Sequence, residues 1–176
     1  MENEDFKIYV SKNKGIFLKK LSLRWYLTPL KLNKINANHP NVCWKCEKEV
    51  GTYFHMWWEC EKVQRFWKQI FKEFSYMCGK DIECNADIAL LSIYENVECG
   101  KMTKEFITNL LTAARLIIAK QWKLKTEFQI EEWYKEIWNI AINDKLTCNL
   151  KIKKGELKRN DFYEIWGKFL EYVLIL

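Results

Sequence analysis

The stretch Cys43-Trp-Lys-Cys46, followed eight residues later by His55-Met-Trp-Trp-Glu-Cys60, decides how this chain folds. Its spacing, C-x2-C-x8-H-x4-C, offers three thiolates and one imidazole. Four such ligands suit the tetrahedral coordination of zinc in a closed structural site. Because protein side chains would fill all four positions, none is left for an activated water. The spacing therefore predicts a zinc-stapled module rather than zinc chemistry.

The residues between the ligands are consistent with this interpretation. A Cys-x-x-Cys pair turns tightly enough to present two sulfurs to one ion. Gly51 lies in the loop that leads to His55 and can take the positive φ that a return turn often needs. His55 and Cys60 are expected near the start of a helix, about one and a half turns apart.

The other cysteines, Cys78, Cys84, Cys99 and Cys148, show no comparable spacing and are expected to behave as small buried hydrophobes. Cys78 or Cys84 remains an alternative ligand. Seven cysteines, an odd number, together with an acidic and polar start, favour a reducing compartment, which is the cytoplasm or the nucleus. The chain has no run of about eighteen apolar residues, so no membrane span is expected.

The composition favours a mainly α fold. The chain has 176 residues, of which 49% are hydrophobic and 15% aromatic, and this is enough for one medium domain or two small ones. Two prolines and six glycines argue against a turn-rich β sandwich. We expect a basic helical segment over 1–40, a CCHC zinc-binding module over 41–80 and a C-terminal helical bundle over 81–176.

Apolar periodicity places helices along most of the chain. Pro29 should end one helix near Leu27 and begin another. Further helices are expected over 55–76, from an N-cap at Thr103 to about 125, over 129–146, and from a cap at Asp161 onward with Phe162, Ile165, Trp166, Phe169 and Val173 buried. Residues 88–94 fit a helical turn or a strand equally well, and 150–160 are expected to form an exposed loop.

Positive charge is concentrated ahead of the metal ligands. Between Phe6 and Pro40 there are eight Lys or Arg residues and no Asp or Glu. Basic residues interleaved with aromatic ones suit a phosphate backbone with bases stacked beside it, so RNA or single-stranded nucleic acid is the expected partner. The candidate contacts are Lys19, Lys20, Arg24, Lys31 and Lys34, with Trp25, Tyr26 and Trp44 as stacking platforms. The alternatives are a solvated lysine-rich helix face and tryptophans that pack in the core.

The sequence lacks the usual patterns of catalysis. It has no Asp-Asp pair of the kind that holds two metal ions in a polymerase, and no Gly-rich loop with G-K-[ST]. Once His55 binds metal, no neighbouring histidine is left to activate a serine or cysteine. We therefore expect a non-enzyme.

Several motifs together resemble a known family. They begin with Leu23-Arg-Trp-Tyr-Leu-Thr-Pro-Leu-Lys-Leu32 and continue through Cys43-Trp-Lys-Cys46, Gly51-Thr52, His55-Met-Trp-Trp-Glu-Cys60 and Phe66-Trp67. This part resembles the zinc-binding region that follows the reverse transcriptase domain of LINE-type (non-LTR) retrotransposon proteins. The motifs Leu110-Leu-Thr-Ala-Ala-Arg-Leu-Ile-Ile-Ala119, Trp122-Lys123, Glu132-Trp133 and Asp144-Lys-Leu-Thr147 resemble the carboxy-terminal tail of the same proteins. The resemblance spans roughly residues 8 to 173.

The resemblance implies a role in RNA binding during target-primed reverse transcription, with Cys43, Cys46, His55 and Cys60 as zinc ligands. In the family this region follows an endonuclease and a polymerase, and this sequence contains neither. The competing interpretation is therefore a protein-interaction or relic structural domain. Such a domain would expose the apolar residues Ile16, Phe17 and Leu21, which in the family's context would pack against a polymerase, and would self-associate.

Overall fold

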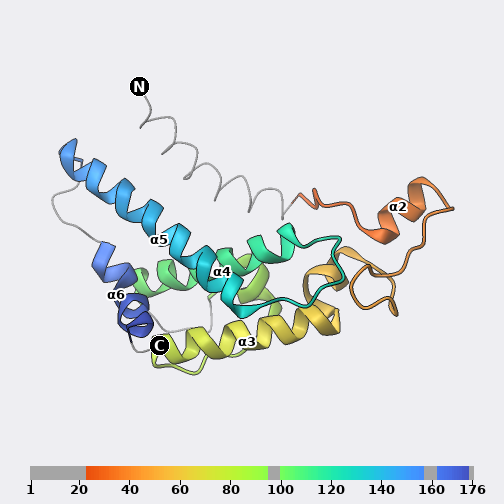
Figure 1. Ribbon diagram of the computed structural model, residues 1–176, viewed down its shortest axis with the longest axis horizontal. Helices are drawn as coiled ribbons and strands as arrows, with labels where there is room; N and C mark the ends of the chain where they lie inside the picture. Colours follow the sequence, from red (N-terminus) through yellow and green to blue (C-terminus); the bar gives the residue numbers. More distant parts are fainter. Residues whose placement is uncertain (1–22, 95–99, 157–161, 175–176) are drawn as a thin grey trace. The chain divides into compact units, whose positions relative to one another are not determined.

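The computed structural model describes residues 23–94, 100–156 and 162–174. Within these ranges the fold is helical and has no β-strand, only an isolated antiparallel bridge between Val42 and Val50. The four predicted ligands precede a series of long helices, so the predicted fold class is confirmed (Figure 1). None of the described helices has the length and apolar character needed to cross a membrane.

The described chain forms two compact units. Unit 1 contains residues 23–67 and 116–129, and unit 2 contains residues 68–115 and 130–174. The metal ligands all belong to unit 1. The predicted division of the chain at residues 40 and 80 stays a prediction.

Helix α2 (Pro29–Ile35) begins as its sequence predicts. Thr28 has extended backbone angles, and its Oγ1 accepts a hydrogen bond from the N–H of Lys31 at 3.1 Å. Pro29 occupies the first turn, where its missing N–H costs nothing. The helix predicted to end near Leu27 lies mostly outside the described residues, but its predicted end is wrong, because residues 23–27 form turns and a bend and are not helical.

Helix α3 (Glu61–Cys78) is amphipathic, and its apolar face is buried. Val63, Trp67, Ile70 and Phe74 have no exposed surface, as their spacing predicts. The prediction of one continuous helix from His55 is wrong, because Cys60 has φ −54° and ψ 128° and interrupts it. A π-helical turn, η1 (His55–Glu59), therefore stands before α3 as a separate element.

Helix α4 (Lys101–Lys120) is buried around much of its circumference, as predicted. The proposed N-cap at Thr103 is wrong: the helix already includes Lys101, and Gly100 O accepts the N–H of Lys104. The helix also ends before the predicted residue 125, because residues 121–123 form a turn.

Helix α5 (Ile130–Lys153) is longer than the predicted 129–146. It ends where Gly155 takes φ 73°, a left-handed conformation that suits glycine after a helix. The predicted loop from residue 150 is therefore wrong for 150–153.

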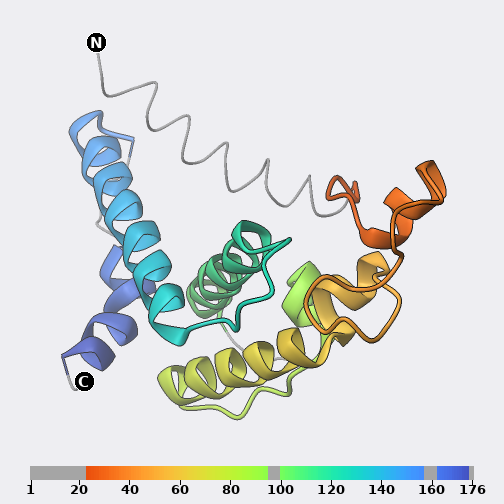
Figure 2. The ribbon, with the colours of Figure 1, turned by 45° about the vertical axis from the view of Figure 1, so that its right-hand side comes forward.

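Helix α6 (Phe162–Val173) lies against α5, as Figure 1 and Figure 2 both show. It buries Phe162, Trp166 and Phe169 as predicted, but Val173 is 38% exposed and its predicted burial is wrong. The predicted cap, Asp161, lies outside the described residues.

A second π-helical turn, η2 (Asp87–Leu91), precedes a short irregular segment. Together they contain residues 88–94, for which the sequence favours neither a helical turn nor a strand. Ser92 ends the turn in the left-handed region. The buried side chain of Arg115 on α4 holds this turn, because it donates to Ala89 O at 2.7 Å, Ile88 O at 3.2 Å and Ser92 Oγ at 2.7 Å.

Candidate metal centre

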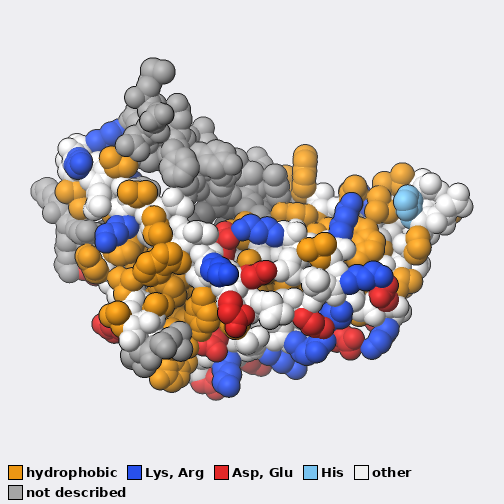
Figure 3. All heavy atoms as spheres, viewed as in Figure 1, with side chains coloured by type: hydrophobic (Ala, Val, Ile, Leu, Met, Phe, Trp, Pro, Cys, Tyr) orange, Lys and Arg blue, Asp and Glu red, His pale blue; other side chains and the backbone are white. Residues whose placement is uncertain are grey.

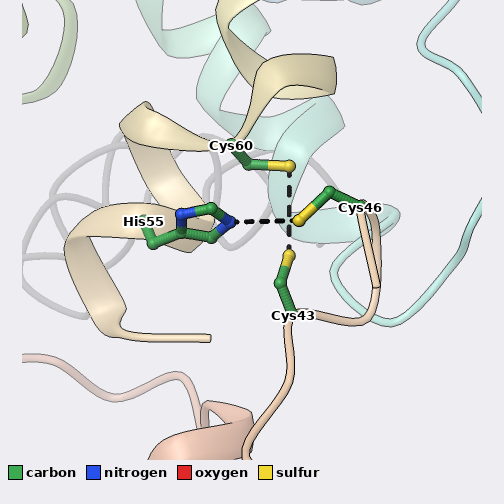
Figure 4. A group of neighbouring side chains, drawn as sticks. All are labelled: Cys43, Cys46, His55 and Cys60. Atoms are coloured by element: carbon green, nitrogen blue, oxygen red, sulfur yellow. Dashed lines mark hydrogen bonds between the residues drawn. The ribbon is translucent and has the colours of Figure 1, made fainter. Parts of the chain in front are cut away.

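The structure brings Cys43, Cys46, His55 and Cys60 together in one group (Figure 4). Their ligand atoms all lie within 4.8 Å of one another. Cys43 Sγ is 3.9 Å from Cys60 Sγ, and Cys46 Sγ is 3.4 Å from His55 Nε2. Zn–S bonds of ~2.3 Å at tetrahedral angles would place two sulfurs roughly 3.8 Å apart. The four side chains can therefore hold a metal ion with little rearrangement.

A tight turn presents the first two ligands. The N–H of Cys43 donates to Glu49 O at 2.8 Å, and the N–H of Gly51 donates to Asn41 O at 2.8 Å. These two bonds flank the antiparallel bridge between Val42 and Val50 and hold the two ends of the turn together. Inside the turn, the N–H of Lys45 points to Cys43 Sγ at 3.4 Å. Such a donor stabilises a thiolate, the form of cysteine that binds metal.

Gly51 has a different role from the predicted one. Its φ is not positive, and the left-handed position in this loop is taken by Glu47 with φ 57°. A Cβ on Gly51 would lie 2.5 to 2.8 Å from three carbons of Pro29, so glycine is needed for close packing. Gly51 O also accepts a hydrogen bond from the N–H of Leu30 at 3.2 Å. This bond connects the start of α2 to residues 43–51, which we call the metal loop.

The turn η1 positions the other two ligands. Thr52 Oγ1 accepts the N–H of His55 at 2.9 Å, and this bond starts the turn. The N–H of Cys60 then donates to His55 O at 2.9 Å, five residues back. The hydrogen bond of a π turn joins residues five apart in the chain, one more than in an α turn. This wider turn brings residues five apart toward one ion, whereas in a regular α-helix they would be about 140° apart around the axis.

The centre is well shielded from solvent. Cys43, Cys60 and His55 are 1%, 0% and 6% exposed, and Cys46 is partly buried. Met56 Sδ lies 3.4 Å from Cys43 Sγ and covers one side. The hydrogen bond that the Cys43 thiol donates to Cys60 Sγ lowers the pKa of the Cys60 thiol and, together with burial, raises the pKa of Cys43.

Lys45 is a residue that sequence reasoning missed. It stands between two ligands, yet it is only 1% exposed. Its Nζ donates to Gln121 O at 2.8 Å and Leu124 O at 3.2 Å, and it lies 4.3 Å from the centroid of the Phe128 ring. Lys45 therefore connects the metal loop to residues 121–128, which follow α4. A lysine in a polar loop carries no sequence signal for such burial.

An aromatic cluster supports η1 inside unit 1. The rings of Tyr26 and Trp57 have centroids 5.4 Å apart, and those of Trp57 and Trp122 are 5.0 Å apart. Trp122 Nε1 donates to Leu27 O at 2.6 Å. Tyr26 is thus a packing residue, and burial raises the pKa of its hydroxyl. Its predicted stacking on a base stays a prediction.

The other predicted nucleic-acid contacts have different surroundings. Arg24, Lys31 and Lys34 are exposed, as is Trp25 with 67% of its surface. Trp44 is partly buried, and Lys123 Nζ lies 5.6 Å from its ring centroid. Lys19 and Lys20 lie outside the described residues, as do Ile16, Phe17 and Leu21 of the competing interpretation.

The alternative ligands Cys78 and Cys84 do not belong to the group found among the described residues. Cys99 lies outside those residues. No protein-family model matches the chain.

Proposed function

We propose that this protein is a non-catalytic, zinc-stabilised module that binds RNA or single-stranded nucleic acid. We further propose that it derives from the C-terminal region of a non-LTR retrotransposon reverse transcriptase protein. The observation that carries the binding proposal is that unit 1 combines a metal centre with exposed cations and an exposed tryptophan on the segment that packs against the metal loop.

The donor set supports zinc. Three cysteines and one histidine are the ligands of many structural zinc sites, whereas hard cations prefer oxygen ligands. Four protein ligands complete a tetrahedron, so the ion would have a structural role and no open position for substrate. Oxygen ligands are not part of the group.

Elemental analysis tests the metal. We expect one zinc per chain in the purified protein and its loss in Cys43→Ser. The matched control is Cys84→Ser, which removes a partly buried cysteine outside the group and should retain zinc. Zinc retained by Cys43→Ser, or another metal in its place, would contradict this part of the proposal.

The charge pattern of unit 1 supports nucleic-acid binding. Several cations of the unit are paired: Lys48 with Glu61, Arg65 with Glu127, and Lys125 with Glu47. Arg24, Lys31 and Lys34 have no carboxylate partner among the described residues. Lys31 and Lys34 stand one helical turn apart on α2, and Trp25, near them in the chain, is 67% exposed.

A charge-reversal variant tests the interface. We expect Arg24→Glu, Lys31→Glu and Lys34→Glu together to weaken binding of a fluorescent single-stranded RNA by at least about tenfold, since the variant would neutralise fewer phosphates and release fewer counterions. The control reverses three exposed lysines of unit 2: Lys68, Lys72 and Lys101. The log–log salt slope should become shallower by about 0.7 for each phosphate that is no longer neutralised. Equal weakening in both variants, or a flat salt response, would argue against this interface.

The origin rests on the resemblance of the motifs and needs its own test. It predicts that genomic reading frames exist in which the same motifs directly follow a reverse transcriptase domain. If related sequences always occur apart from polymerases, the proposed origin is wrong, while zinc and RNA binding are judged by their own experiments.

A further inference from the structure

Helix α5 has two apolar faces. One is buried in unit 2, and the opposite face carries large apolar side chains that remain accessible. Trp138, Ile142 and Leu146 are 45%, 44% and 49% exposed. Because they follow one another at steps of four residues, they form a row along the helix. Figure 3 shows hydrophobic side chains gathered over α5 and α6. Single exposed apolar residues are ordinary, but a row of three is typical of a binding surface.

A groove between α5 and α6 widens this surface. Its volume is about 470 Å³, and Tyr134, Trp138, Phe169 and Val173 contribute to its lining. The Trp138 and Phe169 rings have centroids 6.1 Å apart. The apolar row therefore continues sideways into a depression that can receive a large side chain from a partner.

Charged residues at the two ends of the row are arranged with opposite signs. Glu131 and Lys153 are both exposed, and each lies eleven residues from Ile142, one before it and one after it. At 100° per residue, both fall within about 20° of Ile142 around the helix axis. Trp138 and Leu146 lie four residues to either side of Ile142. Lys135 and Asn149, seven residues before and after Ile142, are exposed on the same face. From its N-terminal end the face therefore carries Glu131, Lys135, the apolar centre, Asn149 and Lys153, and the antiparallel arrangement described next sets Lys135 opposite the neutral Asn149.

We propose that a second copy of this chain packs on this face, with α5 against α5 in antiparallel orientation about a two-fold axis at Ile142. This symmetry places Ile142 on the other copy's Ile142 and Trp138 on the other copy's Leu146. It also places Glu131 beside the other copy's Lys153. A parallel pairing would bring like charges together instead. A two-fold axis repeats every contact between different residues, so the pairs Trp138–Leu146 and Glu131–Lys153 each occur twice.

The interface is small. Two helix faces and the adjoining groove fall at the lower end of specific interfaces, below about 1,200 Å² of total buried surface. We therefore expect a weak and reversible dimer. With Lys135 and Asn149 included, the residues of this face follow one another at steps of three and four, which suits helices inclined by about 20° from antiparallel.

Sedimentation equilibrium of the full chain, without nucleic acid and in low salt, tests the proposal. The wild-type chain is expected to dimerise, and Ile142→Glu to weaken association by about 100-fold or more, because symmetry places the buried charge twice. The control is Leu91→Glu, which alters a 55% exposed apolar residue of η2 and should leave the dimer intact. Helical content measured by circular dichroism confirms that each variant folds.

Charge exchange tests the orientation. Glu131→Lys alone and Lys153→Glu alone should each weaken the dimer by roughly threefold to tenfold, since exposed ion pairs contribute modestly. The double variant should regain wild-type affinity, because it restores both pairs with their signs exchanged. A wild-type chain that stays monomeric at about 500 μM overturns the proposal, and the face would then serve a different protein. A dimer that survives Ile142→Glu, or a double variant without recovery, overturns it as well.

Discussion

Lys45 illustrates how one residue can connect the metal centre to its surroundings. Three thiolates and a neutral imidazole around a divalent ion carry one net negative charge, and the Lys45 ammonium offsets it from inside the protein. Burial lowers the pKa of Lys45 to about 8, while the charges of Cys60 and Cys43 oppose that shift. The thiolates therefore add to the two carbonyl groups in favouring the charged form of Lys45.

Replacing Lys45 tests this connection. Lys45→Met keeps an unbranched apolar stem but removes the ammonium donor from Leu124 O and Gln121 O, of which Gln121 O keeps the N–H of Leu124. We expect a loss of about 2–4 kcal/mol in the free energy of unfolding. Lys48→Met is the matched control, because Lys48 makes only an exposed ion pair with Glu61 and should cost less than about 1 kcal/mol. Denaturant titration at fixed metal concentration measures both. Similar losses in the two variants would refute the role of Lys45.

Gly51 makes a second prediction at the residue scale. Gly51→Ala forces a Cβ against the Pro29 ring, and overpacking of this kind costs about 1–3 kcal/mol. Gly167→Ala is the control, because a Cβ at this position would have nothing within 4 Å and alanine favours a helix. Thermal unfolding should separate the two, with a lower midpoint for Gly51→Ala and an equal or higher one for Gly167→Ala. A neutral Gly51→Ala would show that α2 moves away freely.

At the scale of single elements, the two π-helical turns are held by contacts outside themselves. η1 begins with the hydrogen bond that the N–H of His55 donates to Thr52 Oγ1, and it is followed by the candidate metal ligand Cys60. η2 depends on the guanidinium of Arg115, which is fully buried and whose pKa burial lowers to about 10. Wider turns are uncommon in helices, and here each one aims side chains or carbonyls at a specific partner.

Arg115→Lys tests the support of η2. Lysine cannot reproduce the planar fork that reaches two carbonyls and a hydroxyl, so we expect a loss of about 2–3 kcal/mol and faster amide exchange over 87–92. Arg65→Lys, at an exposed ion pair with Glu127, should change stability by less than about 1 kcal/mol. Hydrogen-exchange mass spectrometry resolves the local effect. Unchanged exchange over 87–92 would mean that η2 is stable without the fork.

At the scale of the whole molecule, the two units differ in what stabilises them. Unit 1 contains the candidate metal centre. Unit 2 buries apolar residues of α4, α5 and α6. One of these residues is Trp133 of α5, whose Nε1 donates to Leu110 O on α4 at 2.9 Å. Removal of metal should therefore affect the units unequally, because a structural zinc site contributes on the order of 10 kcal/mol.

Chelation tests this difference. We expect loss of amide protection over 41–67 and 116–129, with protection retained over 101–115, 130–153 and 162–173. Cys43→Ser without chelator should reproduce the pattern, which controls for effects of the chelator itself. Restoring metal to the wild-type chain should restore protection. Uniform loss across both units would show that the bundle depends on the metal as well.

Sequence patterns predicted the elements better than their ends. Period-3.6 spacing predicted the buried face of α3 and the all-round burial of α4, because those residues repeat over several turns. Thr103 was a wrong N-cap, and α5 continues past residue 146, because capping signals involve one or two residues and neighbouring contacts outweigh them.

The sequence alone determined the mainly helical class and the four residues that gather at the metal centre, since both depend on spacing along a short stretch of chain. Only the tertiary structure decided that Lys45 is buried, that Gly51 makes room for Pro29 and that Tyr26 packs on Trp57. The physical reason is that each of these roles is set by a partner distant in the chain or by a close steric contact. Local periodicity carries no information about either.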